Sequence, residues 1–344
     1  MSDFDRKFAR QLLEICRYTY ARGFDDAINA ADKADALNYI KNVGGMLSDE
    51  PILLCGENSD TSFACVATYP DKNIVAYMGT KTQFNTPSNA IASVEDWSRN
   101  VETPLTPFKL SSAQLGEGYP ATTDPDNLGG LVHEGFLKEL CAVQAQVVNT
   151  LLQHGGRAKP VYVTGHSQGG AEAVLATRAL IAGGFDVVAT YTFAAPRAGN
   201  LAFVQTLPAG LPLHRIEFGD DIVPHVPPAA IRPEMMAIVQ SLKSFPLLSE
   251  QAQSLLKYVE RVNLTGHSFA SAGALCYGSN KTQAMRVDIS ADQEAALFYD
   301  RLWSLIRHPE RWAEHHHLAG TSSDTQAGVK GNYTALVSTF AQVN

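Results

Sequence analysis

The amino-acid sequence predicts an α/β fold in which helices flank a mostly parallel central sheet. Short apolar runs alternate with helical patterns between residues 161 and 218. Such alternation indicates β-α-β units, whose strands lie parallel. Of the 344 residues, 45% are hydrophobic and 18% are charged, which excludes a disordered or fibrous chain and provides for a large core. The sequence contains no internal repeat and no evident linker, so we expect a single domain over residues 1–344.

The N-terminal part is predicted to form two helices followed by three strands. Apolar residues four and three positions apart mark one face of the first helix: Phe4, Phe8, Leu12 and Ile15. A weaker helical pattern covers residues 24–43. Apolar runs bounded by Gly, Pro, Asn or Asp then predict strands at Ile52–Cys55, Phe63–Thr68 and Asn73–Met78.

The middle of the chain is predicted to be a long loop followed by the core of the fold. Residues 81–131 are rich in Thr, Ser, Pro and Asn, with a short helix around Trp97. A long helix then buries an apolar stripe and ends near Gly155; the stripe consists of Phe136, Leu140, Val143, Val147 and Leu151. Further elements are predicted in order: strand 161–164, helix 169–182, strand 187–193, a short helix and strand 213–218.

The C-terminal part is predicted to be mainly helical. Residues 230–262 have the pattern of an inserted helical cap. Residues 274–277 are predicted to be the last strand. Helices over 291–307 and 331–342 close the chain, separated by a loop rich in Gly, Ser and Thr.

Charge and hydropathy exclude several classes of protein. With 35 acidic and 27 basic residues the net charge is −8, and no basic stripe suggests a nucleic-acid partner. No window is apolar for long enough to predict a transmembrane segment. The first residues lack the apolar core of a secretory leader. We therefore expect a cytoplasmic protein, a protein exported without such a leader, or a mature chain.

The cysteines give no indication of a metal site. The five cysteines form no Cys-x-x-Cys pair and no Cys/His cluster, so we expect no zinc site. A bridge between Cys55 and Cys65 is conceivable, but the pattern favours two buried thiols.

The stretch Gly165–Gly169 (Gly-His-Ser-Gln-Gly) carries the clearest chemical signal. It follows a predicted strand and opens a predicted helix, the setting in which a strained turn exposes the hydroxyl of a nucleophilic serine, here Ser167. The N–H of Gln168, at the start of the helix, could then stabilise an oxyanion. A glycine-rich turn without chemistry is the alternative.

A serine nucleophile needs a histidine base and an orienting carboxylate. In hydrolases of this fold the order along the chain is serine, acid, histidine, with the acid in a loop after a later strand. Both Asp220 and Asp221 fit that position. The candidate bases are His225, His267, His308, His315, His316 and His317. We expect His225 at the rim of the site and His267 in the core, and a run of three histidines could also be a metal-binding surface patch.

Further motifs lie between residues 60 and 230, in this chain order: Ile74–Thr80, Asp96–Asn100, Val132–Phe136, Gly165–Gly170, Thr192–Asn200 and Asp221–Pro227. With these segments the sequence resembles the class 3 lipases, the family of the filamentous fungal triacylglycerol lipases. In the same order, the family patterns are a strand and turn ending in R-G-T or R-G-S, then D-W-x-x-N, V-H-x-G-F, G-H-S-L-G-G, T-F-G-x-P-R-x-G-N and D-x-V-P-x-L-P.

The resemblance implies an α/β-hydrolase fold and a set of site residues. Ser167 would be the nucleophile, Asp221 the triad carboxylate and His316 the base. Thr80 and the N–H of Gln168 would form the oxyanion hole. Residues 81–96 would be a lid.

The sequence also departs from the family pattern at three places. Met78 stands where the family has Arg, and Gln168 stands where it has Leu. The Tyr expected a few residues after the histidine is missing, and Tyr333 lies much further on.

The implied activity is hydrolysis of carboxylic esters through an acyl-enzyme, without metal or cofactor. The expected substrate is a triacylglycerol at a lipid–water interface. An esterase or a phospholipase A1 acting on other esters is the alternative, and a non-catalytic lipase-like binding module is a third reading.

Overall fold

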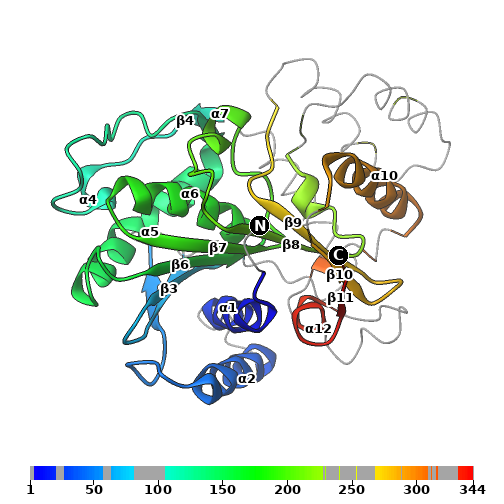
Figure 1. The fold of residues 1–344 in the computed structure, drawn as a ribbon, viewed down its shortest axis with the longest axis horizontal. Helices are drawn as coiled ribbons and strands as arrows, with labels where there is room; N and C mark the ends of the chain where they lie inside the picture. The colour runs from blue at the N-terminus through cyan, green and yellow to red at the C-terminus, as the bar shows by residue number, and fades with distance from the viewer. Residues whose placement is uncertain are drawn as a thin grey trace.

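The computed structural model describes residues 4–20, 27–56, 63–80, 105–227, 229, 240, 253, 268–287, 289–308, 311, 315–316 and 332–343. Nine strands in these segments form one sheet, which Figure 1 shows running through the middle of the molecule. The order across this sheet is β1 (Ile52–Cys55), β2 (Phe63–Thr68), β3 (Asn73–Tyr77), β6 (Val161–His166), β7 (Val187–Phe193), β8 (Leu213–Phe218), β9 (Ala274–Ser279), β10 (Ala284–Arg286) and β11 (Ala341–Val343).

The central strands of the sheet are parallel. Strands β3, β6, β7, β8 and β9 pair in parallel, whereas β1 and β2 add antiparallel strands at one edge. At the other edge β10 runs antiparallel to β9 and parallel to β11. This arrangement confirms the predicted α/β fold.

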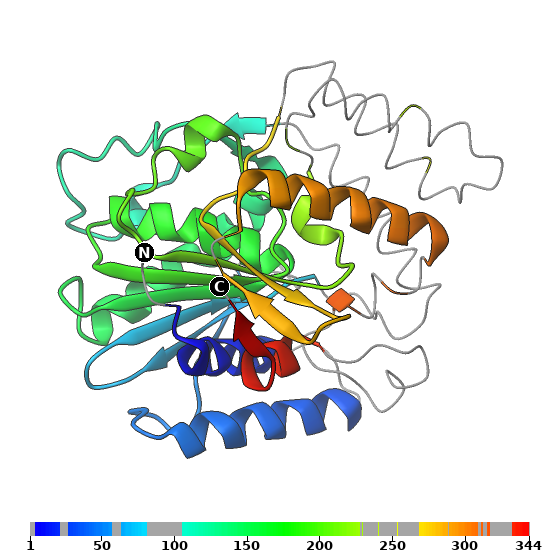
Figure 2. The ribbon, with the colours of Figure 1, turned by 45° about the vertical axis from the view of Figure 1, so that its right-hand side comes forward.

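Helices cover both faces of the sheet, as Figures 1 and 2 show. The helices are α1 (Arg6–Thr19), α2 (Ala27–Val43), α4 (Ser112–Leu115), α5 (Glu134–Gln153), α6 (Gln168–Ala182), α7 (Leu201–Val204), α10 (Ala291–Arg307) and α12 (Tyr333–Ser338), with a 3-10 helix at Val223–His225. One core cluster joins α5 and α6 to the sheet, and a second joins α1 and α12 to its opposite face.

The first and last helices lie side by side. In α1 the Asp5 side chain accepts the Phe8 N–H (2.9 Å), which caps the first turn. Leu12 and Ile15 are fully buried, as the predicted stripe requires. Arg6 Nη2 donates to the carbonyl oxygen of Ser338 (2.9 Å), so the two ends of the described chain are hydrogen-bonded on one face of the sheet.

The predicted elements of the core were found with small shifts of their ends. The apolar stripe of α5 is buried at every predicted position. Strands β7 and β8 and helix α10 match their predicted ranges. The parallel core could be predicted because each of its elements is long enough to carry its own hydrophobic period.

Three predictions about short elements were wrong. Part of the loop predicted over 81–131 contains α4 and a two-stranded sheet of β4 (Leu105–Pro107) and β5 (Leu131–His133). Strand β9 is not the last strand, because β10 and β11 follow it. The helix predicted over 331–342 ends at Ser338, and its final residues form β11. Strands of three residues are too short to show an alternating pattern and depend on distant partners.

Several other predictions lie outside the described residues. These are the lid at 81–96, the short helix around Trp97 and nearly all of the cap at 230–262. All five cysteines are described, and all five are thiols rather than half-cystines. Within the described segments, every helix is too short or too polar to cross a membrane.

Candidate active site

Ser167 occupies a strained turn between β6 and α6. Its backbone has φ +57° and ψ −130°, a conformation that a non-glycine residue rarely adopts. The Ser167 N–H donates to the carbonyl oxygen of Phe193 on the adjacent strand (2.9 Å), which holds the turn in place. Strain of this kind is found at functional sites, where the surrounding structure imposes it.

Glycines make this turn possible by close backbone approach. A Cβ at position 165 would lie 2.0 Å from the carbonyl oxygen of Gly169. A Cβ at position 169 would lie 2.2 Å from the carbonyl oxygen of Tyr77 on β3. Because both contacts are with backbone atoms that cannot move aside, a larger residue at either position would displace the serine.

Ser167, His316 and Asp221 form one line of hydrogen bonds. His316 Nε2 lies 2.8 Å from Ser167 Oγ, and His316 Nδ1 lies 3.0 Å from Asp221 Oδ2. All three side chains are almost completely buried. The arrangement can transfer a proton from the serine hydroxyl to the imidazole while the carboxylate holds the opposite ring nitrogen.

Two further groups hold the Asp221 carboxylate. Asp221 Oδ1 accepts the N–H of Val223 (3.0 Å), and Asp221 Oδ2 accepts the hydroxyl of Tyr333 (2.9 Å). Burial raises the pKa of Tyr333 well above its ordinary value, so the phenol keeps its proton and remains a donor. The sequence indicated a missing tyrosine after the histidine, and Tyr333 reaches the acid from helix α12 instead.

Asp220 and His315 lie beside this line but belong to a different set of contacts. Asp220 Oδ2 accepts the hydroxyl of Ser304 on α10 (2.7 Å). His315 Nδ1 accepts the backbone N–H of Asp220 (2.7 Å) and must be unprotonated to do so. Burial lowers the pKa of His315 to about 4. Neither residue contacts Ser167 in the hydrogen bonds of the described residues.

His166, which precedes the serine, links the site to helix α1. Its Nε2 lies 2.8 Å from the carbonyl oxygen of His316, which can only accept, so Nε2 carries the hydrogen. Its Nδ1 therefore accepts the Tyr20 hydroxyl (2.8 Å). The Tyr20 oxygen in turn accepts the N–H of Gly79 (3.1 Å). This network joins the serine turn, the backbone of His316 and the segment that ends in Thr80.

The predicted oxyanion residues lie next to the serine. A Cβ at position 79 would lie 3.0 Å from Ser167 Cβ, so the turn before Thr80 packs directly against the serine. Thr80 Oγ1 donates to Gln168 Oε1 (2.8 Å). Gln168 is the first residue of α6, and an N–H in the first turn of a helix has no acceptor within that helix. Both side chains are partly exposed.

The other candidate histidines lie elsewhere. His225, predicted at the rim, is only 1% exposed and packs against Phe298 with ring centroids 5.4 Å apart, so that prediction was wrong. His308 ends helix α10. His267 and His317 lie outside the described residues.

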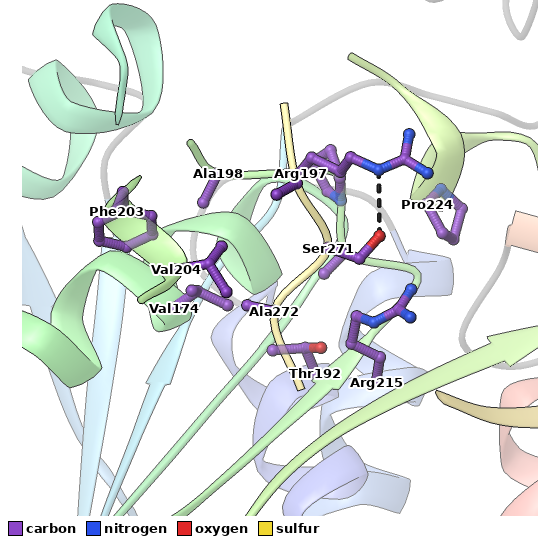
Figure 3. A pocket seen from close by; sticks show the side chains of 13 residues that line it. Val174, Thr192, Arg197, Ala198, Phe203, Val204, Arg215, Pro224, Ser271 and Ala272 are labelled. Atoms are coloured by element: carbon purple, nitrogen blue, oxygen red, sulfur yellow. Dashed lines mark hydrogen bonds between the residues drawn. The ribbon is translucent and has the colours of Figure 1, made fainter. Parts of the chain in front are cut away.

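A separate small cavity is lined by Val174 of α6 and by other residues that do not include Ser167, His316 or Asp221. Figure 3 shows it between Val174, Phe203 and Ala272, with Arg197 Nε donating to Ser271 Oγ (3.1 Å). Its volume is about 10 Å³, roughly the space that one water molecule needs. An acyl chain does not fit there, so we assign this cavity no part in substrate binding.

The chain is similar to known lipases. Residues 87–231 match the family described as Lipase (class 3). A lipase of Rhizomucor miehei is 38% identical over 113 residues, which cover 31% of this chain and 31% of that protein. Secreted mono- and diacylglycerol lipase 1 of Fusarium solani is 38% identical over 102 residues, which cover 28% of this chain and 30% of that protein. The matches thus span about a third of the length of these relatives.

Solved structures share the fold. A deletion mutant in a Rhizomucor miehei lipase propeptide complex superposes with a TM-score of 0.50 at 20% identity, covering 82% of this chain and 69% of that chain. A mutant form of MDLA from Penicillium cyclopium superposes with a TM-score of 0.52 at 16% identity, covering 86% of this chain and 91% of that chain. At these identities the likeness extends to the fold.

Proposed function

Because residues 87–231 match the family described as Lipase (class 3), we propose that the protein hydrolyses the carboxylic esters of acylglycerols through a Ser167–His316–Asp221 triad. The observation that carries the proposal is the continuous hydrogen-bonded line from Ser167 Oγ to Asp221 Oδ2 through the two ring nitrogens of His316, at 2.8 and 3.0 Å. A serine hydroxyl at its ordinary acidity is a weak nucleophile, and a base within hydrogen-bond reach is what activates it.

In the first half of the reaction His316 Nε2 takes the proton of Ser167 Oγ as that oxygen attacks the ester carbonyl carbon. The imidazolium formed is stabilised by the buried Asp221 carboxylate at Nδ1. The tetrahedral intermediate then collapses, and the bond to the glycerol oxygen breaks. His316 gives its proton to this leaving oxygen, so the alcohol departs and the acyl group remains on Ser167.

In the second half water hydrolyses the acyl-enzyme. His316 accepts a proton from the water as its oxygen attacks the acyl carbon, and returns that proton to Ser167 Oγ when the second intermediate collapses. The negative oxygen of both intermediates is bound by the Gln168 N–H and by Thr80. One such donor is typically worth about 10²–10³ in rate.

Triacylglycerols are the substrate that we favour within this class, at a lipid–water interface. The motifs resemble those of the fungal triacylglycerol lipases, and a lipase of Rhizomucor miehei is among the relatives. Monoacylglycerols and diacylglycerols are the second candidate, because a relative from Fusarium solani is a mono- and diacylglycerol lipase with the same identity of 38%.

The test is hydrolysis of emulsified mono-, di- and triacylglycerols, with soluble p-nitrophenyl esters of increasing chain length alongside. Wild type and Ser167→Ala are compared. We expect release of fatty acid from triacylglycerol that disappears in Ser167→Ala. Release from mono- and diacylglycerols alone would support the second candidate. A folded wild type without activity on any ester, or a Ser167→Ala variant with full activity, would contradict the proposal.

A further inference from the structure

A series of hydrogen-bonded polar side chains leads from Thr80 into the core of the protein. Thr80 Oγ1 lies 2.8 Å from Gln168 Oε1, and Gln168 Nε2 lies 2.9 Å from Glu172 Oε1. Gln168 and Glu172 are one turn apart on α6, so they lie on the same face of that helix. This hydrogen-bonded series begins beside Ser167 and ends at the carboxyl group of Glu172, a residue that is 1% exposed.

The carboxyl group of Glu172 is in a setting that favours its neutral form. Its Oε2 is buried without a hydrogen-bond partner among the described residues, and Glu172 makes no ion pair with any of them. Burial raises the pKa of Glu172 well above its ordinary value, and the negative charge of Glu139 on α5 raises it further. The other titratable groups that interact with it, Tyr20 and Tyr77, are neutral phenols.

We propose that Gln168 and Glu172 are positioning residues that orient the Thr80 hydroxyl toward the oxyanion. In the observed direction, Thr80 donates to Gln168 and Gln168 donates to Glu172, so the only hydroxyl proton of Thr80 is engaged by Gln168 and is not available to an oxyanion. This proposal rests on the function proposed above, and adds two residues that do not touch the substrate through their side chains.

The neutral carboxyl group allows the direction of these hydrogen bonds to reverse. A carboxylic acid can donate, whereas a carboxylate can only accept. If the Gln168 amide turns over, Glu172 O–H donates to Gln168 Oε1 and the Gln168 amide N–H donates to Thr80 Oγ1. The Thr80 hydroxyl proton is then available to the oxyanion. The developing negative charge favours this direction, because hydrogen bonds to charged acceptors are about twice as strong as neutral ones.

The sequence around the serine supports a role particular to this chain. Gln168 stands where the class 3 lipase pattern has Leu, and Leu can neither accept from Thr80 nor donate to it. Gln168 is therefore a replacement that brings a hydrogen-bonding group into contact with Thr80, and Glu172 is the last member of the hydrogen-bonded series.

The experiment compares kcat and KM on a soluble p-nitrophenyl ester for Gln168→Leu, Glu172→Leu, Glu172→Gln and Thr80→Val. We expect Gln168→Leu and Glu172→Leu to lower kcat about tenfold, the value of one ordinary hydrogen bond, with KM unchanged. The oxyanion exists only after attack, so binding of the ester itself should not change. Affinity for a trifluoromethyl ketone, which mimics the intermediate, should fall by the same factor as kcat.

Two comparisons separate positioning from a structural effect. Glu172→Gln should recover most of the activity lost in Glu172→Leu, because its amide can still donate to Gln168. The double variant Thr80→Val/Gln168→Leu should be no slower than Thr80→Val alone, since the two residues act through one hydroxyl. An unchanged kcat in Gln168→Leu, or an equal loss in both Thr80 backgrounds, would overturn the inference.

The inference and the proposed function fail in different ways. If Ser167→Ala keeps activity, the proposed function is wrong. If Ser167→Ala is inactive and Thr80→Val is slow while Gln168→Leu matches wild type, only the positioning role is wrong. Should Glu172→Leu fail to fold, Gln168→Leu still tests the positioning role, because Gln168 is partly exposed.

Discussion

Two acid–histidine pairs, Asp220 with His315 and Asp221 with His316, lie one residue apart on the same two segments and have different contacts. Asp221 Oδ2 and His316 Nδ1 are 3.0 Å apart and continue to Ser167. Asp220 Oδ2 and His315 Nδ1 are 4.0 Å apart; the carboxylate oxygen accepts from Ser304, and the ring nitrogen accepts the backbone N–H of Asp220. Side chains at adjacent positions of the sequence can therefore have entirely different hydrogen-bond partners.

The two histidines also differ in the charge that they can carry. His315 Nδ1 accepts a backbone N–H, so protonation of that nitrogen breaks a hydrogen bond. His316 Nδ1 faces a carboxylate, so protonation of the ring forms a charge-assisted pair. This difference supports our proposal that His316, rather than His315, is the base that gains a proton during the reaction.

The largest expected effect is that of removing one imidazole. His316→Ala should lower kcat on a soluble ester by about 10⁴-fold, because Ser167 loses its base. His315→Ala should stay within about tenfold of wild type, because it removes a structural contact. Steady-state kinetics of the two variants measures the difference, with circular dichroism to check folding. Equal losses, or a larger loss in His315→Ala, would contradict the different roles of the two histidines.

The same comparison applies to the two acids. Asp221→Asn should lower kcat by about 10³–10⁴-fold, since an amide neither holds the right tautomer of His316 nor stabilises its charged form. Asp220→Asn keeps an oxygen that can accept from Ser304, and should change kcat little. Kinetics of both variants at pH 8 would contradict the assignment if Asp220→Asn were the slow one.

The stability of the protein should depend on the titration of His315. Burial lowers its pKa from the ordinary 6.5 to about 4. Between these values the unfolded chain binds a proton that the folded protein does not, so the free energy of unfolding falls as the pH falls from about 6.5 to about 4, by up to about 3 kcal/mol. Above pH 6.5 this contribution is fully present.

The control for that measurement is His315→Asn, which keeps an acceptor for the Asp220 N–H but does not titrate. Urea unfolding at a series of pH values should give a shallower slope for the variant than for wild type over this window. Identical slopes would mean that His315 is protonated as readily in the folded state as in the unfolded one.

The smallest expected effect is that of Tyr333→Phe, which removes one of the hydrogen bonds to Asp221. We expect about 1 kcal/mol less stability and a loss of tenfold or less in kcat, because Val223 and His316 still hold the carboxylate. Thermal unfolding and kinetics of this variant report both changes. A loss as large as that of Asp221→Asn would show that Tyr333 has a larger part in holding the triad than the geometry indicates.

The residues brought together around Ser167 could be named from the sequence where a local motif marks them. The serine turn is defined by glycines within two residues of Ser167, and the acid by its position after β8. The periodic spacing of hydrophobic residues likewise predicted the parallel core and α5. In each case the information lies within a few residues of the position concerned.

What the sequence did not reveal depends on contacts between distant segments. Tyr333 reaches Asp221 from a helix more than a hundred residues later, and Tyr20 reaches His166 from the C-terminal end of the first helix. Glu172 looks like an ordinary polar position on a helix until the packing of α6 against β3 buries it. No local pattern encodes such contacts, because burial and pairing are set by the assembled fold.

The roles of Ser167 and His316 are tested most directly by labelling with a fluorophosphonate, which reacts with an activated serine, followed by peptide mapping. Wild type, His315→Ala and His316→Ala are treated alike. We expect one adduct, on Ser167, that forms rapidly in wild type and in His315→Ala and very slowly in His316→Ala. An adduct on another residue, no adduct on folded wild type, or equally rapid labelling of His316→Ala would contradict these roles.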